Sequence, residues 1–166
     1  MTLHTAYLLI GGNLGNRFSH LQKAIGLIEK DCGTITDKSS IYETAAWGLE
    51  DQPDFLNQVL VLQTALDPET LMKQLLLIEE KMGRTRTVKL GPRTIDLDIL
   101  LIDNIVKTTD LLTLPHPALP KRRFALLPLQ EVAPELVHPV EKKTISQLLK
   151  DCTDHLDVQK ITAPAE

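Results

Sequence analysis

The sequence predicts an α+β sandwich, in which helices cover one face of an antiparallel sheet, because strand and helix patterns alternate in a set order. Short runs of β-branched and aliphatic residues predict strands near residues 5–11, 34–43, 59–62 and 95–102. Apolar residues at helical spacing lie between the first two runs and again between the last two. The resulting order βαββαβ is typical of a ferredoxin-like fold.

The first strand leads into a helix through the glycine-rich segment Gly11-Gly12-Asn13-Leu14-Gly15. Asn13 or Asn16 can cap this helix, and Gly33 ends it. Glycines between a strand and a helix either form a tight connection or bring backbone amides to a phosphate. The spacing matches neither a dinucleotide fingerprint nor a P-loop, so neither nucleotide-binding motif is supported.

The middle of the chain completes the predicted sandwich. Trp47, the only tryptophan, lies in a predicted loop over residues 44–54, where its ring either packs on the core or faces a ligand. Asp67-Pro68-Glu69 combines an N-cap acid, a proline at the first helical position and an acid in the first turn. We therefore expect the second helix to begin there and to end at Gly83.

Shorter elements are expected in the C-terminal third. After a turn at Asp103-Asn104, Ile105-Val106 should continue the sheet as a hairpin arm. Recurring prolines leave room only for short helices, near residues 123–127 and 144–150. The last dozen residues have the character of a loose tail.

Length and composition predict one globular domain over residues 1–160, with residues 161–166 as a loose tail. A net charge of −4 argues against a general nucleic-acid surface, which needs a basic face. No signal peptide or membrane span is recognisable, and Cys32 and Cys152 stand far apart without metal-ligand spacing. We therefore expect a cytoplasmic monomer with free thiols, and no nucleic-acid or membrane partner.

Two carboxylates interrupt the apolar run of the fourth predicted strand. Asp96 and Asp98 are two residues apart, so their side chains share one face, with Cα atoms roughly 6.5 Å apart. A divalent cation would neutralise such a pair, and hard oxygen ligands without Cys or His nearby favour magnesium. The alternative is a solvated pair, or one that is balanced by surface cations.

Cationic residues gather just before this strand, at Arg84, Arg86, Lys89 and Arg93. Cations beside two carboxylates indicate a polyphosphate site, in which the cations bind phosphate oxygens and the carboxylates bind magnesium. Glycines bound most of this segment, so we also expect residues 83–91 to form a mobile lid over a triphosphate.

Five separated motifs carry a family resemblance. They are Gly11-Gly12-Asn13-Leu14-Gly15, Asp51-Gln52-Pro53-Asp54-Phe55-Leu56-Asn57, Gly91-Pro92-Arg93-Thr94-Ile95-Asp96-Leu97-Asp98-Ile99, Pro115-His116 and Arg122-Arg123-Phe124. In type and order they resemble the motifs of the 6-hydroxymethyl-7,8-dihydropterin pyrophosphokinases of folate biosynthesis, over about residues 5–140. The resemblance implies an enzyme that transfers pyrophosphate from ATP to the hydroxymethyl group of the dihydropterin and releases AMP.

The resemblance also implies a role for individual residues. Asp96 and Asp98 would hold two magnesium ions on the triphosphate, and Arg84 and Arg93 would be the catalytic arginines. Nucleotide contacts are implied for Arg84, Arg93, Ile99, Thr113, His116 and Arg122. Pterin contacts are implied for Thr44, Phe55, Asn57 and Phe124, with the ring stacked between the two phenylalanines.

Several of these residues have a second interpretation. His116 lies between two prolines, which is also typical of a turn, and phenylalanines near strands commonly belong to a core. Arg86 and Lys89 also fit mobile surface charges. Glu79, late in the second helix, either caps the neighbouring loop region, as its family counterpart does, or is a solvated helical acid.

Two other function classes match parts of the pattern. Nucleotidyltransferases pair aspartates with a glycine turn, but their turn shortly precedes the aspartates, whereas much of the chain separates the two here. An RNA-recognition domain needs exposed aromatic residues and a basic face, which the sequence does not provide. Leu90 and Pro117 stand where the resembled family often has tryptophan and tyrosine, so lid closure and nucleotide affinity are the properties that these two differences affect.

Overall fold

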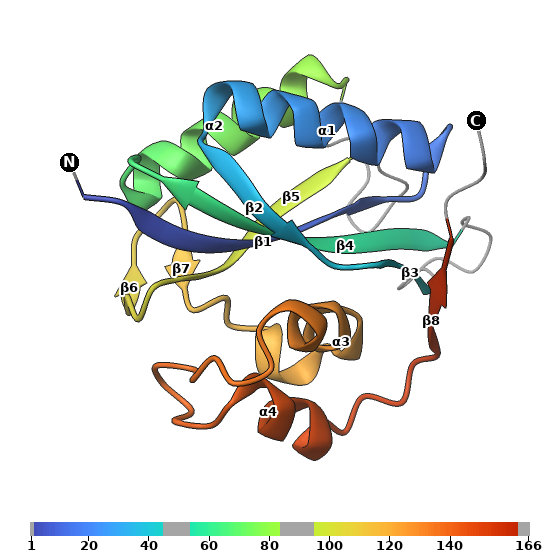
Figure 1. Ribbon diagram of the computed structural model, residues 1–166, viewed down its shortest axis with the longest axis vertical. Helices are drawn as coiled ribbons and strands as arrows, with labels where there is room; N and C mark the ends of the chain where they lie inside the picture. Colours follow the sequence, from blue (N-terminus) through green and yellow to red (C-terminus); the bar gives the residue numbers. More distant parts are fainter. Residues whose placement is uncertain (1, 45–53, 84–94, 163–166) are drawn as a thin grey trace.

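A six-stranded antiparallel sheet forms the middle layer of the computed structural model, which describes residues 2–44, 54–83 and 95–162 (Figure 1). The strands of this sheet are β1 (His4–Gly12), β2 (Thr34–Lys38), β3 (Ile41–Thr44), β4 (Phe55–Thr64), β5 (Asp96–Ile102) and β8 (Val158–Ile161). The order is β5-β1-β4-β3-β8, and β2 pairs with β4 beside β3. The βαββαβ order and the ferredoxin-like sandwich predicted from the sequence are confirmed.

Two long helices, α1 (Arg17–Asp31) and α2 (Pro68–Lys81), cover one face of the sheet (Figure 1). Both begin where the sequence predicts, because Asn16 accepts a hydrogen bond from the Ser19 amide and Asp67 accepts one from the Thr70 amide. Buried residues on this face, including Leu8, form the larger hydrophobic core. We call this side of the sheet the α1/α2 face.

The opposite side, here the α3/α4 face, is covered by α3 (Arg123–Val132) and α4 (Ile145–Asp151), which follow the short helix η1 (Leu119–Lys121) (Figure 1). Leu9 and Val59 meet Leu126 and Leu129 in a second core between this face and the helices. The two helices of the βαββαβ unit thus cover one face, as expected, and the short C-terminal helices, whose position the sequence did not predict, cover the other. None of the helices among the described residues is both long and apolar enough to cross a membrane.

The strand predicted over residues 34–43 is in fact two strands, β2 and β3, which are interrupted at Ser39. The hydroxyl of Ser39 accepts a hydrogen bond from the Val59 amide, and the Ser39 amide donates to the Val59 carbonyl. A side chain thus takes the place of a backbone acceptor at this point of the ladder. Short polar side chains compete with strand pairing in this way, which explains the break.

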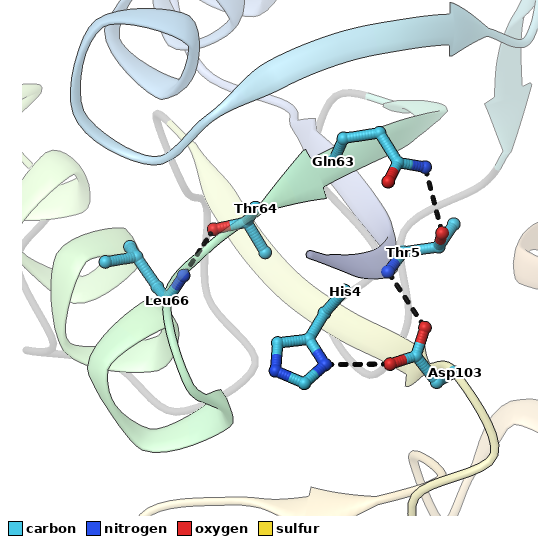
Figure 2. Close-up of polar contacts among 6 residues, drawn as sticks. All are labelled: His4, Thr5, Gln63, Thr64, Leu66 and Asp103. Atoms are coloured by element: carbon cyan, nitrogen blue, oxygen red, sulfur yellow. Dashed lines mark hydrogen bonds and ion pairs between the residues drawn. The ribbon is translucent and has the colours of Figure 1, made fainter. Parts of the chain in front are cut away.

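The predicted hairpin arm is present but does not extend the main sheet. β6 (Lys107–Thr108) and β7 (Thr113–Leu114) form their own two-stranded sheet, and Ile105-Val106 belongs to neither strand. The turn after β5 places Asp103 at φ +48°, and its carboxylate accepts from the Thr5 amide and lies 2.8 Å from His4 Nδ1 (Figure 2). Asp103 therefore ties the end of β5 to the start of β1, and the chain then leaves the sheet.

Two expectations for the C-terminal helices meet different outcomes. The first helix does not stop at Leu127 but continues through Pro128, which is buried together with Leu129. A proline inside a helix loses one hydrogen bond, and burial of these apolar side chains on the sheet offsets that loss. The second helix is confirmed, and Thr144 and Gln147 form a reciprocal capping box at its start.

The sequence predicts a loose tail over the last dozen residues, but part of this segment is a strand. Val158–Ile161 forms β8, which pairs antiparallel with β3 at the edge of the sheet. This strand has only half-buried and exposed residues, so its backbone pairing and not an apolar face explains its position. Residues 163–166 of the expected tail lie outside the part of the chain that the structure describes.

His138 should make the protein less stable in mild acid. It is 3% exposed, and its Nδ1 atom accepts from the amides of Val140 and Glu141, so the neutral ring is required. Burial lowers the pKa of His138, although the Glu141 carboxylate opposes that effect. The unfolded chain then takes up this proton first, and stability falls as the pH drops below about 6.5, the ordinary histidine pKa.

The measurement is the urea midpoint of unfolding between pH 7.5 and pH 5. His138→Asn keeps a side-chain acceptor for the two amides but does not titrate, so its midpoint should depend less on pH than that of the parent protein. Identical pH dependence in the two proteins would show that His138 does not contribute.

Candidate active site

Asp96 and Asp98 project from the α3/α4 face of β5. They are half-buried and alternate with Leu97 and Ile99, which are buried in the core on the α1/α2 face. Because side chains alternate along a strand, the two carboxylates lie on the same side, at Cα positions roughly 6.5–7 Å apart. Two carboxylates on one face provide hard oxygen ligands of the kind that magnesium prefers.

Glu79 holds β5 from the opposite face. Its side chain is 4% exposed, and Oε2 accepts a hydrogen bond from the Leu97 amide at 2.8 Å. β5 lies at the edge of the sheet, so amides that point away from β1 need a partner other than a strand. The Glu79 carboxylate is the acceptor for the Leu97 amide, which lies between the two aspartates. The interpretation of Glu79 as a solvated helical acid is therefore wrong.

Gly11 connects the aspartates with the proposed pterin residues. It pairs with Asp96 of β5 on one side and with Asn57 of β4 on the other. Two strand spacings separate these partners, which corresponds to about 10 Å between their Cα atoms. A Cβ atom on Gly11 would lie 2.5 Å from Asn57 Oδ1 and would also clash with the Leu56 carbonyl. Glycine is thus required because both the Leu56 carbonyl and the Asn57 amide lie against this position.

Sequence reasoning missed this role of Gly11. The sequence favours a tight connection or a phosphate-binding turn here, and the family resemblance implies that the segment borders the pterin pocket, but neither indicates that β1 continues through Gly12 with Gly11 beneath Asn57. A signal was available, because glycine inside a predicted strand commonly marks close approach of another group. Of the two suggested caps, Asn16 is the one that caps α1.

Thr44, Phe55 and Asn57 lie together at the ends of β3 and β4. Thr44 pairs with Phe55 in the ladder, and Asn57 Nδ2 lies 3.4 Å from the Thr44 hydroxyl, to which it donates. Phe55 and Asn57 flank Leu56, which is buried on the α1/α2 face, so both project from the α3/α4 face. The three residues therefore share this face with the aspartates.

Phe124 and Arg122 come from the start of α3, which packs over β3 and β4. The Arg122 guanidinium carbon is 5.5 Å from the centroid of the half-buried Phe124 ring. Asp154 accepts a hydrogen bond from the Arg123 amide and so satisfies the helix start, which has no side-chain cap of its own. The aromatic ring and the cation are thereby held on the face that carries Thr44, Phe55 and Asn57.

His116 lies beside β5, because its amide donates to the Leu100 carbonyl at 2.9 Å. Its Nδ1 atom accepts from the Ala118 amide, so the neutral ring carries its proton on Nε2. Burial, and then the positive charge of Arg122, lower the pKa of His116. His116 is thus a turn histidine, as one interpretation held, and it also lies within the electrostatic influence of Arg122.

The remaining predicted nucleotide residues differ in what they can offer. Thr113 is half-buried at the start of β7. Ile99 is 4% exposed and packs in the core beneath α1 and α2, so only its backbone is available to a ligand.

Arg84, Arg86, Lys89 and Arg93 lie outside the described residues, and with them most of the segment expected to form a lid. Trp47 and Leu90 lie outside them as well. Within the described ranges, no group of three or more His, Cys, Asp or Glu side chains is arranged to hold a metal ion. A metal bound by Asp96 and Asp98 would therefore take further oxygens from water and phosphate, which is how magnesium commonly binds.

Comparison with solved structures supports the fold. An HPPK-DHPS crystal structure in complex with substrates superposes with a TM-score of 0.73 at 19% identity, covering 90% of this chain and 43% of the other. The wild-type Plasmodium falciparum HPPK-DHPS with pterin and p-hydroxybenzoate gives 0.73 at 20% identity, with the same coverage. The chain thus matches less than half of these longer proteins.

Sequence comparison gives closer relatives. The 2-amino-4-hydroxy-6-hydroxymethyldihydropteridine pyrophosphokinase of Aquifex aeolicus is 42% identical over 149 residues, which cover 90% of this chain and 92% of the relative. The enzyme of the same name from Bacillus subtilis is 42% identical over 142 residues, covering 85% and 83%. The folic acid synthesis protein fol1 of Schizosaccharomyces pombe is 40% identical over 145 residues, but these are only 20% of its length.

The family model described as 7,8-dihydro-6-hydroxymethylpterin-pyrophosphokinase matches residues 7–134. This range runs from β1 to the end of α3 and includes all of the candidate site residues described above. With relatives above 40% identity over most of both chains, the chain belongs to the 7,8-dihydro-6-hydroxymethylpterin-pyrophosphokinase family.

Proposed function

We propose that this chain transfers the pyrophosphoryl group of ATP to 6-hydroxymethyl-7,8-dihydropterin in folate biosynthesis, with the roles given below for individual residues. Membership of the pyrophosphokinase family supports the reaction, in which ATP is the co-substrate. The hydroxymethyl oxygen attacks the β phosphorus, the bond from that phosphorus to the α–β bridging oxygen breaks, and the hydroxyl proton is released. AMP and the pterin diphosphate are the products.

The single observation that carries the assignment of the site is the arrangement around Gly11. The aspartate pair and the Asn57 amide lie on one face of the sheet, and one strand separates them. A triphosphate bound at the aspartates and a pterin bound at Asn57 would thus approach each other over β1. Positioning of this kind supplies a large part of the catalysis in phosphoryl transfer.

Asp96 and Asp98 are the proposed magnesium ligands, with two ions in the complete complex. Bound magnesium would neutralise charge on the triphosphate and favour the ionised form of the attacking hydroxyl. Glu79 assists indirectly, because its hydrogen bond to the Leu97 amide fixes the strand between the two carboxylates. Arg84 and Arg93 are proposed as the catalytic arginines on the motif resemblance alone.

The pterin is proposed to lie between Phe55 and Phe124, with its edge against Asn57 and Thr44. Aromatic stacking favours such a flat ring by about 1 kcal/mol per pair beyond burial. The weak hydrogen bond to Thr44 orients the Asn57 amide before the ligand arrives. A preorientated amide loses less entropy on binding.

Nucleotide contacts are proposed for His116, Arg122 and Thr113 and for the backbone of Ile99. The neutral His116 ring offers an Nε2–H donor, and the exposed Arg122 side chain offers a guanidinium to phosphate oxygens. Arg122 and the ring of Phe124 are in contact range, so the phosphate and pterin subsites adjoin each other in this proposal.

We also propose a cytoplasmic monomer. Cys32 and Cys152 are both free thiols, as expected in a reducing compartment. Burial, and then the Asp31 carboxylate, raise the pKa of Cys32 to about 11, so this thiol stays protonated and unreactive near neutral pH.

The direct test is incubation with magnesium, ATP and 6-hydroxymethyl-7,8-dihydropterin, followed by separation of the products. Release of AMP together with a diphosphorylated pterin supports the proposal. Free pyrophosphate with a nucleotide-linked pterin would instead support a nucleotidyltransferase.

Replacement of either aspartate by asparagine should nearly abolish transfer. We expect Asp96→Asn and Asp98→Asn to lower kcat by about a hundredfold or more, because a lost metal carboxylate removes several kcal/mol of transition-state stabilisation. The urea midpoint of each variant, measured alongside, separates a loss of catalysis from a loss of folding. Near-normal turnover at saturating magnesium would remove the altered residue from the mechanism.

Phe124→Ala should weaken pterin binding by about tenfold, because both stacking and apolar burial are lost. Calorimetry should give a much smaller change for a non-hydrolysable ATP analogue. Met72→Ala is the control, since Met72 is a large, partly buried apolar residue of α2 that packs against the core on the opposite face. Equal losses for both ligands in Phe124→Ala would contradict the proposed stacking role.

Gly11→Ala should also weaken pterin binding, by about tenfold, because the added methyl group pushes the Leu56 carbonyl and the adjacent Asn57 amide out of place, and the hydrogen bond of that amide is worth about 1 kcal/mol or more. The control is Gly26→Ala in α1, where a Cβ atom meets nothing within 4 Å and helix propensity favours alanine. Calorimetry with the pterin and thermal unfolding measure the two effects. Unchanged pterin affinity in Gly11→Ala would show that Asn57 does not bind the pterin edge.

A further inference from the structure

Arg17, the first residue of α1, joins the ends of two strands. Its Nη1 atom donates to Glu43 Oε2 at 2.6 Å and to the Asp54 carbonyl at 2.9 Å. Glu43 directly precedes Thr44, the last residue of β3. Asp54 directly precedes Phe55, the first residue of β4. One guanidinium nitrogen therefore binds both strands immediately beside two of the proposed pterin residues.

The position of Arg17 in α1 is electrostatically unfavourable for the helix alone. A helix N-terminus carries partial positive charge and favours acidic residues, yet the first turn of α1 contains none. A cation at this position has its compensating contact outside the helix, in the Glu43 carboxylate. The Arg17 and Glu43 side chains are only 26% and 30% exposed, so solvent screens their interaction less than that of a fully exposed pair.

Arg17 reaches the strands from the face opposite to the proposed pterin site. Glu43 shares its strand face with Ile41, which packs against the core beneath α1 and α2. Thr44 and Phe55 project from the other face, and they form the last paired residues of the β3–β4 ladder. The guanidinium thus fastens the backbone behind the ladder end without occupying the space of a ligand.

We propose that Arg17 is a positioning residue for the pterin subsite, a role that rests on the function proposed above. By holding Glu43 and the Asp54 carbonyl together, Arg17 sets the separation of Thr44 and Phe55. Pterin binds more tightly when these two residues are already in place, because less ordering remains to be done on binding. ATP binds over β5 and does not depend on this contact.

The test measures pterin and ATP affinities separately in Arg17→Ala and Glu43→Gln. We expect the pterin Kd and KM to rise about tenfold in Arg17→Ala, a change that corresponds to about 1.4 kcal/mol. The Kd of a non-hydrolysable ATP analogue should change by less than about twofold, and kcat should fall less than the pterin KM rises. Glu43→Gln keeps the shape of the side chain and should give a smaller change in the same direction.

Lys143→Ala is the matched control. Lys143 pairs with Asp151 at 2.9 Å on α4, so this variant also breaks a surface ion pair but leaves the β3–β4 ladder untouched. It should bind both ligands like the parent protein. When Arg17→Ala is added to the Glu43→Gln variant, the further loss of pterin affinity should be smaller than the loss that Arg17→Ala causes in the parent protein. The two residues act through one contact, so their effects do not add.

Unchanged pterin Kd and KM in Arg17→Ala would overturn the inference, whatever happens to the melting temperature. Equal weakening of pterin and ATP would overturn it too, because the contact would then be only structural. Phe55→Ala and Asn57→Ala separate this failure from failure of the proposed function. If those variants weaken pterin binding and Arg17→Ala does not, only the positioning role of Arg17 fails. If none of the three weakens pterin binding, the proposed subsite itself is wrong.

Discussion

The simultaneous pairing of β1 with β4 and β5 is the constraint on which the candidate site depends. Its register places Gly11 opposite Asn57 on one side and Asp96 on the other. A slip of one residue would turn each of these side chains to the other face of the sheet. Buried Leu8 and Ile10 oppose such a slip, because it would move them out of the core beneath α1 and α2. The core thus determines where the polar residues of the site lie.

Local signals in the sequence predicted much of this arrangement, and long-range contacts account for what it missed. The cap at Asp67, the short helix near residues 144–150 and the face shared by the two aspartates follow from residues that are close in sequence. The break at Ser39 requires knowledge of its partner Val59, which no local pattern contains. β8 has no apolar face to indicate a strand, and the contact of Arg17 with Glu43 joins residues from separate elements.

The two faces of the sheet have different roles in the proposed site. Residues proposed to touch ligands lie on the α3/α4 face, whereas Glu79 and Arg17 hold the same strands from the α1/α2 face. Both supporting residues are charged and bind backbone groups near the site, which is an efficient use of strong hydrogen bonds. Changes in the α1/α2 layer can therefore alter ligand affinity without changing any group that meets the ligand. Surveys limited to ligand-contacting side chains would overlook such positions.

The pairing of β8 with β3 has a consequence for how the protein is made. A ribosome releases β3 well before the strand that completes its outer edge, because β8 follows α3 and α4 in the chain. Until then β3 has β4 on one side and an open edge on the other, and Thr44 lies in that strand. Contacts between residues so far apart in sequence form slowly, because a long loop must close first. This edge of the sheet is therefore sealed only after α3 and α4 have left the ribosome.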